Sequence, residues 1–306
     1  MNEHKLVEIF VNCDDFYKEF EKFLSDKGLG DDPLKKLSSL NCQMSPSEVM
    51  TVAIFYHLSG FKCFKYFYCQ GILKHWKKDF PDAVSYNRFI EIKREVNMAL
   101  YFFIHYHGLG KQTGTYYVDS TKLEVCDNHR IHSHKVFKEI AARGKTSTGW
   151  FYGLKLHLVI NEQGELMGIC FSPGNVSDNN ESIVGQLCRN LEEGGKIFGD
   201  AGYVSQKLFE LLWEQGLQLI TKIRKNMKNK ILGMKEKLLL KKRFIVETVI
   251  DLLKNHNDLW HTRHRSIDNG FNNMLACLAA YNFRELKPSI NTPKRDFYLA
   301  LAAQNP

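Results

Sequence analysis

Hydrophobic residues in this chain change their spacing near residue 110, from a helical to an alternating pattern. Up to that point apolar side chains recur at helical spacing, as in "DDFYKEFEKFL" and "SYNRFIEIKREVNMALYFFIHY". Beyond "HGLGKQTG", the segments "TYYVDSTKLEV" and "GWFYGLKLHLVI" alternate in the manner of β-strands. We therefore predict a helical domain over residues 1–110, followed by an α/β domain over residues 111–306.

The helical part contains one strong helix start and one ambiguous aromatic segment. In "MSPSEVMTVAIFYHL", Ser45, Pro46 and Glu48 have the pattern of a capping box with proline in the first turn. In "FKCFKYFYCQ", aromatic residues are interleaved with lysines. Such a segment either packs into a core, which is the commoner outcome, or faces a nucleic acid. The region is expected to form a small helical domain.

The α/β part is expected to form one mixed, five-stranded sheet that helices cover on both faces. Its first three strands follow one another closely, with a turn at "NEQG" between the second and third, so they should be antiparallel. The later strands, "KIFGD" and "LQLITKIRK", alternate with helical segments. Alternating strands and helices are typical of sheets with both faces covered.

Three acidic residues occupy places that this sheet would bring together. Asp119 interrupts the apolar run "YYVDST", Asp200 closes "IFGDAGY", and Glu247 lies in the helix "RFIVETVIDLLKN" after the last strand. If the first and fourth strands are adjacent, these places converge at one edge of the sheet. Clustered carboxylates repel one another unless a cation neutralises them, and their hard oxygens suit Mg²⁺ or Mn²⁺. Each aspartate alone could instead be an ordinary strand-end or turn residue.

Two basic residues share the helix of Glu247. At about 100° per residue, Arg243, Glu247 and Lys254 fall within roughly 40° of one another, and apolar residues fill the opposite arc. A solvated ion pair between positions i and i+4 would have the same pattern. Beside a metal cluster, Arg243 and Lys254 would instead contact the phosphates of a bound strand. The helix alone leaves both interpretations open.

The chain as a whole resembles the bacterial insertion-sequence transposases of the DDE type, whose catalytic domain has a ribonuclease H-like fold. The resemblance runs over nearly the whole chain. The matching stretches are "YYVDST", "AARGKTSTGWFYGLKLHLVIN", "SPGNVSD", "GDAGYVSQKLFE", "QLITKIRKNMKN", "KKRFIVETVIDLLKN", "HTRHRS" and "NMLACLAAYNF". Arg243, Glu247 and Lys254 keep the spacing of the Y-R-E-K signature of these transposases, but Leu240 stands in the place of its tyrosine.

The resemblance implies a DNA transposase that binds the terminal inverted repeats of its element, cleaves at the element ends and joins the 3′-OH ends to target DNA. It makes Asp119, Asp200 and Glu247 the catalytic residues and the ligands of two Mg²⁺ ions, for which Mn²⁺ can substitute. Asp178 in "GNVSDNN" is a secondary acid, expected to cap the next helix. The helical domain would bind the DNA ends. Cutting two ends in concert implies a homodimer on double-stranded DNA.

Further basic residues are candidates for DNA contact. The net charge of +8 favours an anionic partner. Arg143 and Lys145 lie in "ARGKTSTGW", a basic segment close to the first acid that could also be a solvated loop. Arg263 and Arg265 in "HTRHR" either reach phosphates or form an ordinary basic surface.

Two other functions are compatible with the same residues. The chain could be a metal-dependent DNA nuclease that cuts without strand transfer, or a non-catalytic DNA-binding relic of a transposase. Its eight cysteines include no CxxC pair, which favours reduced thiols in the cytosol. No stretch has the length and apolar character of a membrane span. We therefore expect a cytoplasmic bacterial protein that associates with the nucleoid when it binds DNA.

Overall fold

The computed structural model describes four stretches of the chain, residues 3–28, 43–222, 232–260 and 264–290. They form two compact units, each of which is described by itself. The helical unit contains the described residues up to Gly108, together with Leu253–Leu259 and His264–Arg284. The sheet unit contains Leu109–Leu252, Trp260 and the described residues from Glu285 onward. No helix in the described stretches is long and apolar enough to cross a membrane.

The helical unit is built around a buried helix that begins at the predicted capping box. Its elements are α1 (Glu3–Asp26), α3 (Pro46–Tyr56), α4 (Phe64–Tyr66), the π-helix η1 (Phe67–His75), α5 (Tyr86–Ile92), the 3₁₀-helix η2 (Lys93–Val96), α6 (Asn97–Tyr106) and α11 (Ile267–Asn282). The Ser45 hydroxyl accepts from the Glu48 N–H, and the Ser45 N–H donates to Glu48 Oε2 at 2.7 Å. The capping box is thus confirmed, and it starts a helix whose residues are almost all buried.

The aromatic segment "FKCFKYFYCQ" contributes mainly to the core of the helical unit. Phe67 and Tyr68 are fully buried, and the Tyr68 ring centroid lies 4.6 Å from that of Phe89. Tyr66, in contrast, has 59% of its surface exposed, and Lys62, Cys63 and Lys65 are also exposed. The core interpretation of this segment is confirmed for Phe67 and Tyr68.

The C-terminal helix α11 also belongs to the helical unit, where it contacts α3 and α6. The Asn272 side chain donates to the Lys93 carbonyl at 2.7 Å and to Asn97 Oδ1 at 3.0 Å. These bonds tie α11 to the point where η2 ends and α6 begins. Residues that the sequence presents as one long helix, 85–106, are thus α5, η2 and α6 in succession.

The sheet unit is a mixed six-stranded sheet with helices. Its elements are β1 (Thr115–Cys126), the 3₁₀-helix η3 (Asn128–Ser133), β2 (Ala142–Thr146), β3 (Gly149–Asn161), β4 (Leu166–Pro173), α7 (Glu181–Cys188), β5 (Lys196–Gly199), the short 3₁₀-helix η4 (Ala201–Tyr203), α8 (Gln206–Glu214), β6 (Gln218–Thr221), α9 (Met234–Lys241) and α10 (Phe244–Asp251). The π-helix η5 (Leu252–His256) follows α10 directly. The predicted continuation of the last strand beyond residue 222 lies outside the described residues.

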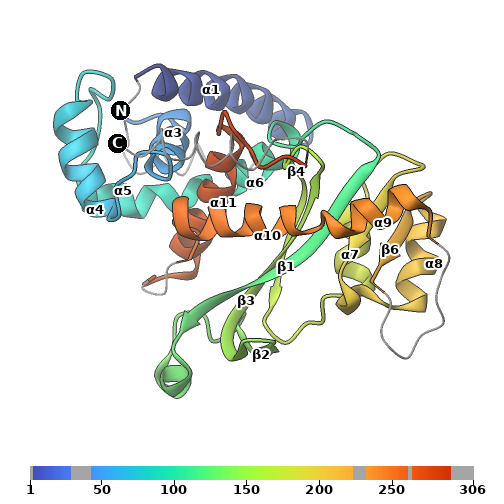
Figure 1. Cartoon of the computed structure of the whole chain (residues 1–306). Helices are drawn as coiled ribbons and strands as arrows, with labels where there is room; N and C mark the ends of the chain where they lie inside the picture. Colours follow the sequence, from blue (N-terminus) through green and yellow to red (C-terminus); the bar gives the residue numbers. More distant parts are fainter. Residues whose placement is uncertain (1–2, 29–42, 223–231, 261–263, 291–306) are drawn as a thin grey trace. The chain divides into compact units, whose positions relative to one another are not determined.

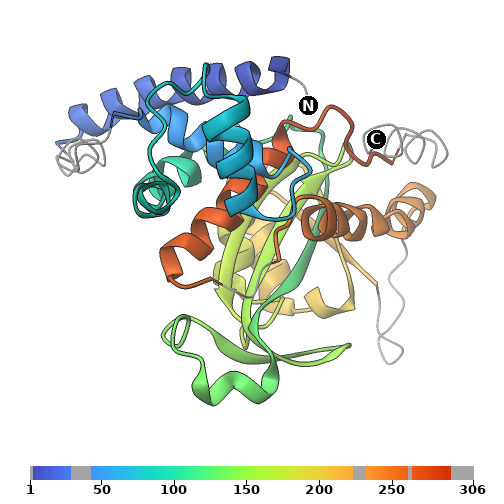
Figure 2. The same ribbon diagram turned by 90° about the vertical axis from the view of Figure 1, so that its left-hand side faces the viewer.

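The strand order confirms the predicted fold class. Without β2, the order is β4-β3-β1-β5-β6, in which β1, β3 and β4 are antiparallel while β5 and β6 run parallel to β1. This is the arrangement of a ribonuclease H-like sheet, preceded in the chain by helices. Strand β2 is an addition to the five predicted strands, and it pairs with the first residues of β3. Strand β2 and η3 lie where β1 ends and β3 begins, at one end of these two long strands (Figures 1 and 2).

Different helices cover the two faces of the sheet beside β1. Tyr116 and Val118 belong to a buried core with side chains of α7 and α8, such as Leu187 and Leu208. Residues that alternate with these two along β1 point to the opposite face. On that face α10 contacts β1, and Figure 1 shows it crossing the strand. Asp119 lies on the α10 side.

Candidate functional site

The parallel pairing of β1 with β5 brings Asp119 and Asp200 together. Tyr117 is the register partner of Phe198, and their ring centroids lie 5.6 Å apart. Asp119 and Asp200 each follow two residues later, so their side chains emerge on the same face of adjacent strands. Asp200 ends its strand by capping η4, where its Oδ1 accepts from the Gly202 N–H at 2.7 Å. The convergence of Asp119 and Asp200 was predicted from the sequence, although Asp119 lies within β1 rather than at its end.

Glu247 is joined to Asp119 through Arg243. Arg243 immediately precedes α10; its Nη1 donates to Asp119 Oδ2 at 3.2 Å and its Nη2 to Glu247 Oε1 at 2.7 Å. The side chain of Arg243 is 12% exposed and that of Glu247 is 57% exposed. The i,i+4 pair expected of an ordinary solvated helix is therefore present, but its arginine points at the first acid of the candidate site.

Burial and the nearby negative charges both raise the pKa of the Asp119 carboxyl. Burial raises the pKa of its carboxyl from 3.8 to about 6, and the nearby charges of Asp200 and Glu247 act in the same direction. The Ser120 N–H, which donates to Asp119 Oδ1 at 2.8 Å, and the Arg243 guanidinium oppose this rise in pKa. The three acids thus interact electrostatically, and a cation among them lowers their mutual repulsion.

The carboxylate oxygens of the three acids suit a hard divalent cation. In this structure the positive charge next to Asp119 and Glu247 is the guanidinium of Arg243. Asp119, Asp200 and Glu247 offer carboxylate oxygens only, the ligand type that Mg²⁺ and Mn²⁺ prefer. Among the described residues, no three His, Cys, Asp or Glu side chains are gathered closely enough to hold a metal ion. The side chains fit the ion chemically, and Arg243 is the group placed between two of them.

A second polar cluster lies on the other side of β1, and the sequence did not reveal it. Lys155 of β3, with a side chain only 9% exposed, donates to the Val176 carbonyl at 2.8 Å and to Asp178 Oδ1 at 2.9 Å. The Ser120 hydroxyl donates to the same Asp178 oxygen at 2.6 Å. The prediction that Asp178 caps the next helix is wrong, because the cap is Asn180, which accepts from the Ile183 N–H. Asp178 is instead engaged with the residue that follows Asp119.

Two further buried polar residues belong to this side of the sheet. His157 is completely buried, its Nε2 lies 2.8 Å from the Ser172 hydroxyl, and burial lowers the pKa of its ring to about 4. The Tyr203 hydroxyl is buried with no hydrogen-bond partner among the described residues, and burial with the charges of Asp119 and Asp178 raises its pKa. The alternation in "GLKLHLV" carried the signal for Lys155 and His157, since polar residues on one side of a doubly covered strand must be buried.

The remaining predicted DNA contacts are spread over both units. Arg143 and Lys145 lie on strand β2 rather than on a loop, next to the Trp150 ring. Lys254 lies in η5 and exposed Arg265 just before α11, and both belong to the helical unit. Arg263 lies outside the described residues.

The helix expected over residues 243–255 changes type partway along. It is an α-helix over Phe244–Asp251 and a π-helix over Leu252–His256. The π turn is wider than an α turn and shifts Lys254 around the helix axis by about 40° relative to an uninterrupted α-helix, so its position on the face of Arg243 and Glu247 stays a prediction. Leu240, which stands at the tyrosine place of the signature, lies near the end of α9.

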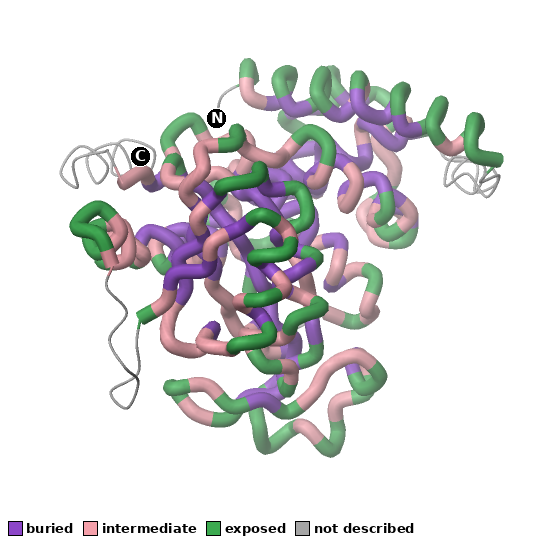
Figure 3. The backbone as a smooth tube through the Cα atoms, turned by 90° about the vertical axis from the view of Figure 1, so that its right-hand side faces the viewer, coloured by how far each residue is buried: buried purple, intermediate pink, exposed green. Residues whose placement is uncertain are grey.

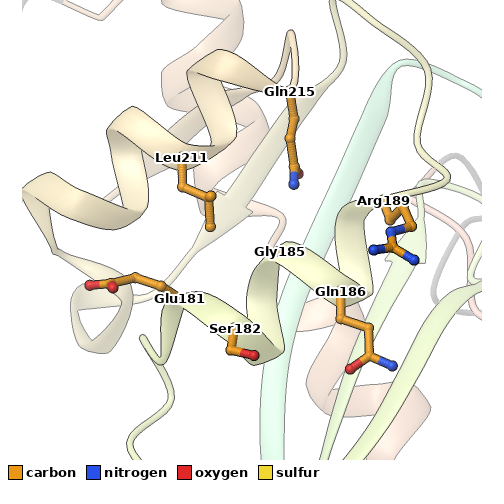
Figure 4. A pocket seen from close by; sticks show the side chains of 7 residues that line it. All are labelled: Glu181, Ser182, Gly185, Gln186, Arg189, Leu211 and Gln215. Atoms are coloured by element: carbon orange, nitrogen blue, oxygen red, sulfur yellow. The ribbon is translucent and has the colours of Figure 1, made fainter.

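A pocket between α7 and α8 is separate from these clusters (Figure 4). Glu181 and Arg189 line it from the α7 segment, and Gln215 lines it from the end of α8. Both helices pack on the face of the sheet opposite to Asp119. The pocket is therefore not part of the carboxylate site.

Comparisons with known proteins place these residues in context. A family model described as "Transposase DDE domain" matches residues 109–267, about half of the chain. Among solved structures, the chain is similar to the piggyBac transposase in a synaptic complex with hairpin DNA, with 10% sequence identity and a TM-score of 0.44. That match covers 86% of this chain and 78% of the other. No curated protein matches the sequence.

Proposed function

Because the chain belongs to the transposase DDE domain family, we propose that it is the DNA transposase of an insertion sequence. It binds the terminal inverted repeats of its element, cleaves the DNA at the element ends and joins the freed 3′-OH ends to target DNA. The observation that carries this proposal is that Asp119 interacts electrostatically with both Asp200 and Glu247 and is joined to Glu247 through Arg243. Asp119 and Glu247 are 128 positions apart in the chain.

The three acids are proposed as the ligands of two Mg²⁺ ions, with Mn²⁺ as a substitute. When bound, such ions would activate the attacking water and stabilise the leaving oxygen in an in-line displacement at phosphorus. The chain's own contribution is to orient the carboxylates. Asp119 is held by the Ser120 N–H, Asp200 by the Gly202 N–H, and Glu247 by the helix that packs over β1.

Arg243 has a second role in this proposal. Its guanidinium now binds Asp119 and Glu247, and a phosphate group offers the same bidentate geometry that a carboxylate does. DNA in the site would draw Arg243 from the carboxylates to the backbone. That exchange would leave the oxygens of Asp119 and Glu247 available when the phosphodiester arrives.

The proposed DNA contacts extend over both units. Arg143 and Lys145 of the sheet unit, and Lys254 and Arg265 of the helical unit, would bind phosphates along the duplex. The helical unit is proposed to recognise the terminal repeats. Two ends must be cut together, so a homodimer is the proposed form on DNA.

The test is cleavage of a supercoiled plasmid that carries the DNA flanking this gene, with purified protein and Mg²⁺ or Mn²⁺. Wild type is run beside Glu247→Gln, and beside Glu214→Gln, which removes an exposed acid of α8 as a matched control. We expect ends cut at the element boundary and joined products with wild type and the control. Both should be lost with Glu247→Gln.

Other outcomes separate the alternatives. Cutting without joining when target DNA is supplied would favour a metal-dependent nuclease. Binding of the flanking DNA without metal-dependent cutting would favour a non-catalytic relic. Unchanged cutting by Glu247→Gln would remove Glu247 from the site.

A further inference from the structure

The hairpin of β2 and β3 carries an exposed aromatic residue between two cations. Trp150 is 52% exposed. The guanidinium carbon of Arg143 lies 4.9 Å from its ring centroid, and the ammonium of Lys145 lies 5.5 Å from it. The pairing register accounts for this contact, since Lys145 is the partner of Trp150 and Arg143 the partner of Tyr152. We call these three residues, Arg143, Lys145 and Trp150, the Trp150 patch.

The Trp150 patch is on the same side of the sheet as the carboxylate site. Leu158 of β3 is the register partner of Asp119, and side chains along a strand alternate between the faces. Trp150, eight residues before Leu158, therefore points to the side of Asp119, at a distance along the strand of roughly 26 Å. About eight base pairs of duplex DNA span that length. Figure 3 shows that the chain around this tip of the sheet is mostly exposed or half-buried.

The charges of the patch favour a polyanion as its partner. Neither Arg143 nor Lys145 forms an ion pair with an acid of the described residues, in contrast to Lys155 and Arg243. A guanidinium stacked on an indole is restricted in its rotamers but keeps its N–H groups directed outward. Such a cation loses less freedom when it binds a phosphate than a free surface arginine does.

We propose that Trp150 holds Arg143 and Lys145 as a pre-oriented pair of phosphate-binding groups, which contacts the DNA backbone about eight base pairs from the carboxylate site. This inference rests on the proposed function. It makes Trp150 a positioning residue, which acts through Arg143 and Lys145 and does not itself stack on a base. A duplex that contacts both the Trp150 patch and the site of Asp119 would have its axis held in one orientation relative to the sheet.

The test measures the affinity of the full-length protein for a labelled duplex of the element end, over a range of salt concentrations. Each phosphate contact contributes about −0.9 to the slope of log K against log salt. Arg143→Gln should weaken binding about tenfold and make the slope shallower by about one. Trp150→Ala should also make the slope shallower, and Trp150→Phe should retain most of the affinity because its ring still attracts the cations.

The double variant Trp150→Ala/Arg143→Gln decides whether Trp150 acts through the arginine. Its loss of affinity should be smaller than the product of the two single losses. The matched controls are Trp213→Ala and Lys207→Gln on α8; Trp213 is 64% exposed and lies on the opposite helix layer. Both controls should bind like wild type.

Several results would overturn the inference while the proposed function stands. One is a Trp150→Ala variant that binds like wild type. Another is a loss with an unchanged salt slope that adds fully to that of Arg143→Gln, which indicates direct stacking on a base. Should Trp150→Ala fail to fold by circular dichroism, the slopes of Trp150→Phe and Arg143→Gln decide the question. Wild type that does not bind the duplex at all would overturn the proposed function as well.

Discussion

An ion cluster lies on each side of strand β1, one around Lys155 and one around Arg243. The two clusters differ in how many of the cation's N–H groups have hydrogen-bond partners. Lys155 donates to both a carbonyl and Asp178, and its side chain is almost fully buried. Arg243 binds Asp119 and Glu247, but its buried Nε has no hydrogen-bond partner among the described residues. Lys155 is thus a built-in part of the fold, whereas we propose that Arg243 exchanges its partners when DNA binds.

Ser120 connects the two clusters. Its N–H binds Asp119 on one side of the strand, and its hydroxyl binds Asp178 on the other. The Lys155–Asp178 cluster therefore holds the backbone of β1 next to Asp119. In the proposed site, the Lys155–Asp178 cluster would keep the backbone of β1 fixed while an ion or a phosphate takes the place of a partner of Arg243.

The largest expected effect is on the free energy of unfolding, which is lowered when the buried carboxyl of Asp119 is ionised. Its pKa is about 6 in the folded protein and near 3.8 when unfolded, so between pH 4 and 6 the folded state holds a proton that the unfolded state has lost. The free energy of unfolding therefore falls as pH rises through this window, by about 3 kcal/mol at pH 7. Asp119→Asn should remove this loss and be more stable than wild type at pH 7, without divalent ions.

Urea unfolding of both proteins at pH 4, 5, 6 and 7 measures this difference. The gap between Asp119→Asn and wild type should open between pH 4 and 6 and stay constant above. A constant gap over the whole range would show that Asp119 titrates as an ordinary carboxyl.

The next effect compares the two cations directly. Lys155→Met leaves Asp178 without its charge partner in a mostly buried place, and should lower the free energy of unfolding by about 2–3 kcal/mol. This value is below that of a fully buried pair because the Asp178 side chain is 36% exposed. Arg243→Met should cost less than about 1 kcal/mol, since Glu247 is largely exposed and Asp119 can take up a proton.

Thermal or urea unfolding at pH 7 gives both values. Equal losses for Lys155→Met and Arg243→Met would mean that Arg243 is as firmly built in as Lys155, and the contrast between the clusters would disappear.

The smallest effect concerns competition between Arg243 and a metal ion. Without DNA, Arg243→Gln should bind Mn²⁺ about tenfold more tightly than wild type, because the guanidinium no longer occupies the carboxylates. Titration followed by the electron paramagnetic resonance of free Mn²⁺ measures this affinity without any enzymatic readout. Lys207→Gln is the control for a general change in net charge. Unchanged or weaker Mn²⁺ binding would show that Arg243 supports the acids rather than competing for them.

The places of the acids could be predicted because they depend on local patterns. Each aspartate directly follows a buried apolar run, and the parallel pairing of those two runs brings Asp119 and Asp200 together, although Asp119 lies within β1 and only Asp200 follows the end of its strand. The pairing with β2 could not be predicted in this way, because "ARGKT" is short and charged. Gly144 lets this strand pass close to the carbonyl of Gly174, where a Cβ would collide.

Two other features of the structure depend on tertiary packing and therefore could not be predicted from local sequence patterns. One is the π turn after Asp251, which inserts a residue into a helix whose sequence is regular. Another is the burial of Lys155 and His157, which alternate with apolar residues along β3 as the polar residues on one side of a half-exposed strand do. Because the sheet is covered on both faces, that side is the interior, and its polar groups became a buried network.

The division of the helical unit between two distant segments has a consequence for synthesis of the protein. Helix α11, which packs on α3 and α6, leaves the ribosome only after Leu109–Leu252 of the sheet unit have been translated. A chain truncated by a premature stop within the sheet unit would therefore leave the faces of α3 and α6 uncovered. Only translation through α11 yields a complete helical unit, so we expect a chain that stops earlier to be prone to proteolysis.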